Sequence, residues 1–140
     1  GKTDVLQMLN GAIGGLVAIT AEPLMPTPLA AILIGSVGGI IVIFGTKLLF
    51  LFKIDDVVGA IPAHLFAGIW GTLVVPLTNH DASFSAQLLG VIAINVFVFV
   101  VSFTIWSIMK TTIGIRLSKD AEKTGTDVFE TGVIAYAIRD

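Results

Sequence analysis

Residues 84–109 read FSAQLLGVIAINVFVFVVSFTIWSIM, without a single Asp, Glu, Lys or Arg. A helix needs roughly 20 predominantly apolar residues to cross the hydrocarbon core of a bilayer. Polar and apolar residues do not alternate here, as they would in a strand of a membrane barrel. Since a backbone in lipid must satisfy its own hydrogen bonds, the stretch predicts a transmembrane helix.

The composition of the whole chain agrees with a membrane protein. Hydrophobic residues make up 55% of the 140 residues, charged residues only 13%, and the mean hydropathy is +0.97. These values lie far outside the range of a soluble domain. With no cysteine in the sequence, disulfides and cysteine nucleophiles are excluded. No basic patch indicates nucleic acid binding, and no residue pattern indicates an enzyme, a cofactor or a metal site.

Three further apolar stretches precede this one, and the four together predict an all-α polytopic transmembrane helix bundle. We expect residues 1–113 to form the transmembrane part and residues 114–140, where charged residues return, to form a tail. Gly114, Gly125 and Gly132 interrupt the tail, so it should be a capped or folded extension rather than one long helix. The expected helices cover residues 4–21, 28–52, 56–77 and 83–113.

The connections between these helices are polar or rich in proline. Residues 22–28 contain three prolines, residues 53–56 (Lys-Ile-Asp-Asp) are charged, and Ser83 is placed to cap the fourth helix. In a four-span arrangement all eight Lys and Arg fall on one side of the membrane. Because cationic segments face the cytoplasm, we expect a multi-pass protein of the cell membrane with both chain ends inside.

The first two helices carry the same glycine pattern. Gly11 and Gly15, like Gly35 and Gly39, are spaced G-x-x-x-G, which allows helices to approach to backbone contact. We interpret them as packing sites, and we expect their faces to need partners beyond this chain. The chain begins Gly-Lys-Thr-Asp, without an initiator Met or a signal peptide, which predicts a piece of a longer protein.

His64 lies within an uncharged run, residues 57–79. An ionisable side chain at membrane depth is a functional-site hypothesis by default, and histidine exchanges protons near neutral pH. On an α-helix, small residues would share its face and leave space over the imidazole. These residues are Ala60, Ala67, Gly68 and Gly71.

Two interpretations of His64 remain open. It lines a pore or relays protons in the space above the small residues, or it is a buried packing residue hydrogen-bonded to a neighbouring helix. Pro62 bears on both, because it lacks an N–H. The carbonyl of Val58 therefore loses its usual helical partner just below the histidine.

Other titratable residues have simpler explanations. His80, beside Asp81 in a polar loop, is expected to be solvated, and the two supply too few ligands for a metal site. Asp55 and Asp56 resemble a carboxylate pair for acid–base chemistry. Because they lie at a turn with Lys53, capping and anchoring of the third helix is the favoured interpretation.

Three blocks of the sequence resemble one protein family. Residues 54–72, IDDVVGAIPAHLFAGIWGT, closely resemble the histidine-bearing helix of the ammonium transporter (Amt/Mep/Rh) family. Residues 10–20, NGAIGGLVAIT, are similar to an earlier helix of that family, and parts of residues 114–136 are similar to its cytoplasmic tail.

The resemblance implies a homotrimer of eleven-helix subunits, each with its own narrow hydrophobic pore for ammonium or ammonia. This chain would supply the last four helices and the tail, and the missing N-terminal helices would complete the subunit in the bilayer. His64 would be the second of two pore histidines, and Asp55 and Asp56 would match aspartates at the cytoplasmic start of its helix. The implied activity is transport; an ammonium-sensing membrane domain of a signalling receptor is the alternative.

In the tail, the resemblance implies contacts with neighbouring subunits and with a PII-type regulator. Thr131 departs from the family pattern, because the family commonly has a histidine at that place. The tail residues that match the family are Arg116, Gly125, Asp127, Gly132 and Tyr136.

Overall fold

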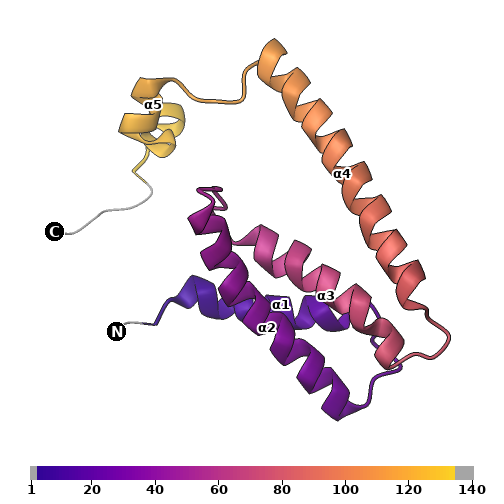
Figure 1. The fold of residues 1–140 in the computed structure, drawn as a ribbon. Helices are drawn as coiled ribbons and strands as arrows, with labels where there is room; N and C mark the ends of the chain where they lie inside the picture. The colour runs from indigo at the N-terminus through magenta and orange to yellow at the C-terminus, as the bar shows by residue number, and fades with distance from the viewer. Residues whose placement is uncertain (1–2, 135–140) are drawn as a thin grey trace. The chain divides into compact units, whose positions relative to one another are not determined.

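The computed structural model describes residues 3–134 of the chain, and within that range it contains helices and no strand (Figure 1). The all-α prediction is confirmed. The α-helices are α1 (Val5–Ile19), α2 (Pro28–Leu51), α3 (Ala67–Val74), α4 (Phe84–Thr112) and α5 (Lys119–Thr124). They are accompanied by the π-helical segments η1 (Ile61–Phe66) and η3 (Asp127–Thr131) and the 3-10 turn η2 (Val75–Leu77). Both α2 and α4 are long and apolar enough to cross a membrane, whereas α1 and Ile61–Leu77 are shorter apolar helices.

Polar side chains cap the N-termini of α1, α2 and α4. The Ser83 hydroxyl accepts a hydrogen bond from the backbone N–H of Ala86 at 3.1 Å, which confirms the predicted cap of α4. The Thr27 hydroxyl caps α2 and the Asp4 carboxylate caps α1 in the same way. Each cap satisfies an N–H that has no partner within its own helix.

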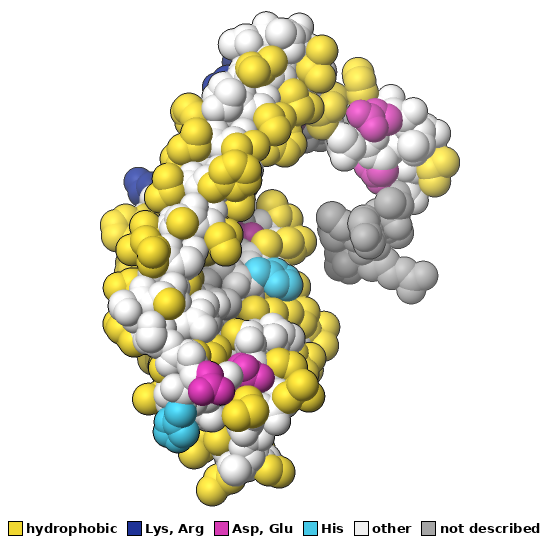
Figure 2. Space-filling view, turned by 90° about the vertical axis from the view of Figure 1, so that its right-hand side faces the viewer, with side chains coloured by type: hydrophobic (Ala, Val, Ile, Leu, Met, Phe, Trp, Pro, Cys, Tyr) yellow, Lys and Arg dark blue, Asp and Glu magenta, His cyan; other side chains and the backbone are white. Residues whose placement is uncertain are grey.

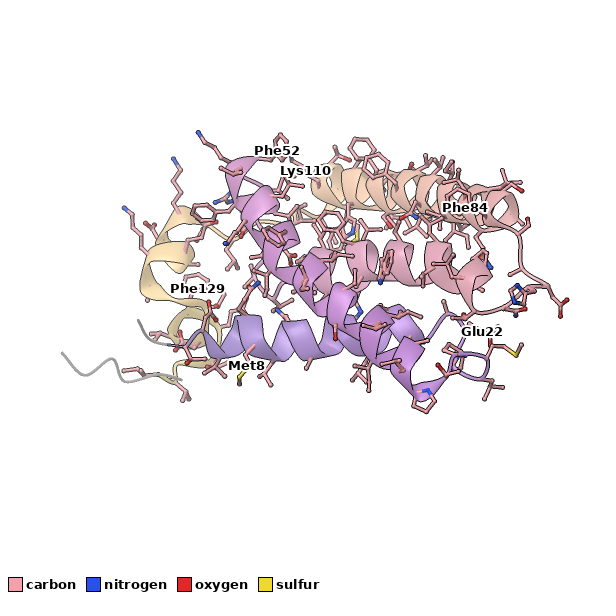
Figure 3. The ribbon with its side chains drawn as sticks, turned by 60° about the horizontal axis from the view of Figure 1, so that its bottom comes forward. Met8, Glu22, Phe52, Phe84, Lys110 and Phe129 are labelled. Atoms are coloured by element: carbon pink, nitrogen blue, oxygen red, sulfur yellow. The ribbon has the colours of Figure 1, made fainter. Side chains whose placement is uncertain are left out.

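The chain divides into two compact units, Gly1–Val96 and Phe97–Asp140. In the first unit, α1, α2 and the segment formed by η1 and α3 pack side by side (Figure 1). Figure 3 shows the hairpin of α1 and α2, with Met8 and Phe52 toward one end and Glu22 at the turn. The core between these helices is small, and its most fully buried side chains are Ala18, Val42, Pro62, Ala63, Ala67.

The two glycine-bearing helices touch backbone to backbone. A Cβ atom built on Gly38 would lie 2.6 Å from the carbonyl oxygen of Gly14, and one on Gly15 would lie 3.0 Å from that of Gly35. The glycine pattern therefore serves packing, as predicted. The expectation that these faces need partners beyond the chain is wrong for this pair of helices, because each supplies the partner of the other.

The third apolar segment departs from the helix expected at 56–77. The helix begins at Ile61, because the preceding residues form a turn in which Gly59 has φ +73°, a left-handed conformation that glycine adopts without strain. The chain is π-helical as far as Phe66 and α-helical from Ala67. Pro62 lies at the start of this irregular stretch, where it cannot donate to the helical ladder.

Within α4, all of which is described, no residue is buried. Such a surface suits a helix surrounded by lipid or by further helices. Several of its polar side chains bond back to their own helix: Asn95 donates to the Val91 carbonyl at 2.7 Å, and Thr104 to that of Val100 at 2.8 Å. These bonds lower the cost of placing polar groups in an apolar setting.

The second unit contains the end of α4 and the tail. The Ser118 hydroxyl accepts a hydrogen bond from the N–H of Ala121 at 3.2 Å and begins α5. Gly125 and Gly132, both with positive φ, end α5 and η3. The tail is thus a capped and interrupted extension, as the glycine positions predicted.

Among the residues that match the family tail, Arg116 makes an exposed ion pair. Its guanidinium donates to the Glu122 carboxylate at 2.6 and 3.2 Å. This hydrogen bond holds the pKa of Glu122 below its ordinary value, so the contact is lost only as the pH falls through that lowered pKa. Asp127 begins η3, and Tyr136 lies outside the described residues.

Gly38→Ala is expected to destabilise the protein by about 1–3 kcal/mol, the usual cost of overpacking. The added methyl group would meet the Gly14 carbonyl oxygen at 2.6 Å and the Ala18 Cβ at 2.7 Å. Gly11→Ala is the matched control, because nothing lies within 4 Å of its Cβ position. Thermal unfolding of the detergent-solubilised protein checks this, and equal Tm values for the two variants would contradict it.

Candidate functional site

A groove of about 290 Å³ lies within the first unit, between the third apolar segment and the first half of α4. Its surface is mainly apolar with a few polar groups, a composition typical of small-ligand sites. The third segment contributes His64, Gly68 and Thr72, and α4 contributes Gln87 and Asn95.

His64 is exposed in this groove, and no hydrogen bond joins its imidazole to another residue between 3 and 134. Figure 2 shows histidine side chains at the surface, among hydrophobic ones. A packing histidine would instead be buried against a neighbouring helix. Both ring nitrogens of His64 are therefore available to a ligand or to a group outside the described residues.

The small residues expected to share the face of His64 have different surroundings in the structure. Gly68 lines the groove with His64, whereas Gly71 is buried against α1, where its Cβ would lie 2.9 Å from Cα of Ala18. Ala60 is exposed at the start of the helical segment, directly before Ile61. The π-helical stretch η1, with i→i+5 bonds, winds the chain differently from the α-helix that the spacing assumed.

The polar residues that α4 brings to the groove, Gln87 and Asn95, were missed by the sequence analysis. Asn95 uses its amide N–H on the Val91 carbonyl, which leaves its own carbonyl oxygen for the groove. The sequence did contain a signal for this polar face, because the amides Gln87 and Asn95 lie eight residues apart in an otherwise apolar run. That spacing places them on one face of a helix. The pattern did not indicate which helix that face lies opposite.

Asp56 caps the irregular third segment. Its two carboxylate oxygens accept hydrogen bonds from the N–H groups of Ala60 at 2.9 Å and Ile61 at 2.8 Å. Asp55 is exposed and makes no hydrogen bond within the described part of the chain. The geometry fits capping of the third segment by Asp56.

The Val58 carbonyl that Pro62 leaves without a helical donor has found a partner in α1. The side-chain amide of Asn10 donates to it at 2.7 Å, across 48 positions of sequence. Asn10 is only 7% exposed. The sequence indicated the unpaired carbonyl but not the residue that satisfies it.

At the opposite end of the first unit the loops are tied by polar contacts. Asn79 donates to the Glu22 carboxylate at 2.9 Å and so joins the two loops. His80 is exposed, in keeping with a solvated loop residue. Between residues 3 and 134 no group of three His, Cys, Asp or Glu is arranged to hold a metal ion.

An all-helical chain with two helices of membrane-spanning length and an apolar groove containing a free imidazole belongs to the class of helical membrane proteins. Comparison with family models identifies the family within this class. Residues 1–136 match the model described as Ammonium Transporter Family, and the chain belongs to that family.

Individual relatives agree. Ammonium transporter Amt2 of Archaeoglobus fulgidus is 35% identical over 97% of this chain and 33% of its own length. A Synechocystis protein, provisionally named an ammonium transporter, is 41% identical over 94% of this chain and 30% of its own length. The chain thus spans about a third of these relatives. No solved structure matches it significantly.

Asp56→Ala is expected to destabilise the first unit by about 1 kcal/mol, because two N–H groups at the start of a helix lose their acceptor. Asp55→Ala is the matched control, since the Asp55 side chain is exposed and makes no hydrogen bond within the described residues. The Tm of the complete protein in detergent, measured for both variants, checks the prediction. A larger loss from Asp55→Ala would overturn the assignment of the cap.

Proposed function

We propose that this chain forms part of a path by which ammonium, or ammonia released from it, crosses a membrane, with His64 in that path. The observation that carries the proposal is the exposed imidazole of His64, without a hydrogen-bond partner in the described chain, in a mainly apolar groove. The relatives are named as ammonium transporters, which favours a transport path over an ammonium-sensing domain.

The physical argument concerns charge. Moving bare ammonium through an apolar passage is costly, whereas ammonia is neutral and needs only hydrogen-bond partners. A neutral imidazole offers one donor and one acceptor, and it exchanges protons near neutral pH. Thr72, Gln87 and Asn95 add polar groups along the same groove, so a small polar solute would have partners at several points.

We further propose that the chain is the C-terminal part of a longer subunit. Residues 1–113 would be its last four membrane helices, and a second pore histidine would come from missing N-terminal helices. Support comes from the coverage of about a third of each relative, and from the all-round apolar α4. The subunits would form a homotrimer in the cell membrane.

The tail, residues 114–140, is proposed to be a regulatory segment on the cytoplasmic side. It would contact neighbouring subunits and a PII-type regulator. Support comes from the exposed ion pair of Arg116 with Glu122 and from the glycine-ended helices α5 and η3, which give the tail a polar surface. The candidate contact residues are Arg116, Gly125, Asp127, Gly132 and Tyr136.

His64→Ala in the complete protein is expected to lower ammonium-driven current at least tenfold, a barrier change of about 1.4 kcal/mol. The substitution removes the polar relay, while folding survives because the side chain is exposed and makes no hydrogen bond within residues 3–134. The measurement is the current on a solid-supported membrane after an ammonium concentration jump.

His80→Ala, which removes the other histidine of the chain from an exposed loop, is the matched control and should keep the wild-type current. Unchanged current in His64→Ala at equal protein yield would remove His64 from the path and defeat the proposal.

The proposed orientation predicts a labelling pattern. Cysteines placed at positions 22 and 80 should react with a membrane-impermeant thiol reagent in intact cells, and those at 53 and 116 should not, because cationic segments stay inside. The same protein without the introduced cysteine is the background control. Labelling at position 53 would reverse the topology.

A further inference from the structure

We infer that Asn10 is a positioning residue that sets the orientation of His64 in the groove; this rests on the proposed function of His64. Asn10 is the one buried polar side chain among the described residues. Burying an amide costs free energy unless it is hydrogen-bonded. The bond that compensates runs from Asn10 Nδ2 to the Val58 carbonyl oxygen at 2.7 Å.

The Asn10 amide also lies against the backbone of the neighbouring residue. A Cβ on Gly59 would lie 3.3 Å from Cγ of Asn10 and closer still to its nitrogen. Gly59 has φ +73°, so a side chain there would be strained as well as obstructed. The turn is therefore shaped around the amide, which a residue serving only to fill volume would not require.

Two side chains stabilise this turn, one as a hydrogen-bond acceptor and the other as a donor. Asp56 accepts from the N–H groups of Ala60 and Ile61, and Asn10 donates to the carbonyl of Val58. The two bonds of Asp56 are local and stabilise the shape of the turn where it enters the helix. The bond of Asn10 connects the turn to α1 and so fixes where the turn lies relative to the packed helices.

His64 follows directly from this turn. Pro62 and Ala63, the two residues before it, are buried, and a Cβ on Gly45 of α2 would lie 2.9 Å from Cβ of Pro62. The buried residues fix one side of the π-helical stretch, and the turn fixes the direction in which it starts. The side of the helix on which residue 64 emerges is thereby determined, and it emerges into the groove.

Gln7 supplies a comparison on the same helix. Its amide donates to the Val42 carbonyl at 3.5 Å and to the Thr46 hydroxyl at 3.4 Å, both in α2. These contacts join α1 to α2 without touching the turn. A change at Gln7 disturbs helix packing only, whereas a change at Asn10 disturbs packing and the start of the histidine-bearing helix.

The test measures the placement of residue 64 directly. In the complete protein, freed of other reactive cysteines, His64→Cys serves as a reporter that reacts with a small methanethiosulfonate reagent. Asn10→Leu, which keeps the volume but removes the donor, should change the reaction rate at least fivefold. Gln7→Leu should change it less than twofold. An unchanged rate in Asn10→Leu would overturn the inference, as would an equal change in Gln7→Leu.

If Asn10→Leu yields no folded protein, Asn10→Ala takes its place, with the same expected change and the same overturning result. In parallel, Asn10→Leu with His64 intact should lower the maximal rate of methylammonium transport at least fivefold and change its apparent affinity less than twofold. The two proposals can fail separately. Full transport by His64→Ala would refute the path through His64. The reaction rate of the cysteine reporter depends only on the position of residue 64, so it tests the role of Asn10 independently of transport.

Discussion

Backbone polar groups in an apolar environment have no water to bond, so the chain itself must satisfy them. Most of this fold meets that requirement by being helical, and the ends of its helices meet it with side chains such as Thr27 and Ser83. The requirement is hardest to meet where the third segment begins, because Pro62 supplies no donor. There the chain uses Asp56 for two N–H groups and Asn10 for one carbonyl.

The bond from Asn10 is possible only because α1 lies very close to its neighbours. Glycines at the contact of α1 and α2 bring the two backbones together, and Gly71 does the same between α3 and α1. A short side chain such as asparagine then reaches the turn before Gly59. In lipid, where apolar surface is not driven together by water, such close packing is a main source of helix association. The glycine pattern and the buried amide are therefore parts of one arrangement.

The sequence was sufficient to predict what depends on local chemistry. Apolar stretches predicted the helices, Ser83 was expected as a cap, and the missing N–H of Pro62 indicated an unpaired carbonyl at Val58. Prediction failed where distant residues decide the conformation. The face assigned around His64 assumed a regular α-helix, and the turn with its π-helical continuation removed that regularity. Asn10 was not foreseen, because no local pattern relates positions 48 residues apart.

The irregular start of the third segment includes the histidine, because His64 lies within the π-helical stretch. Gly71, in the α-helical part that follows, packs against α1, while His64 is exposed. π-helical turns are costly and are found frequently at functional sites. Here the π-helical stretch contains the exposed imidazole, which is the side chain that the proposed path for a small polar solute depends on.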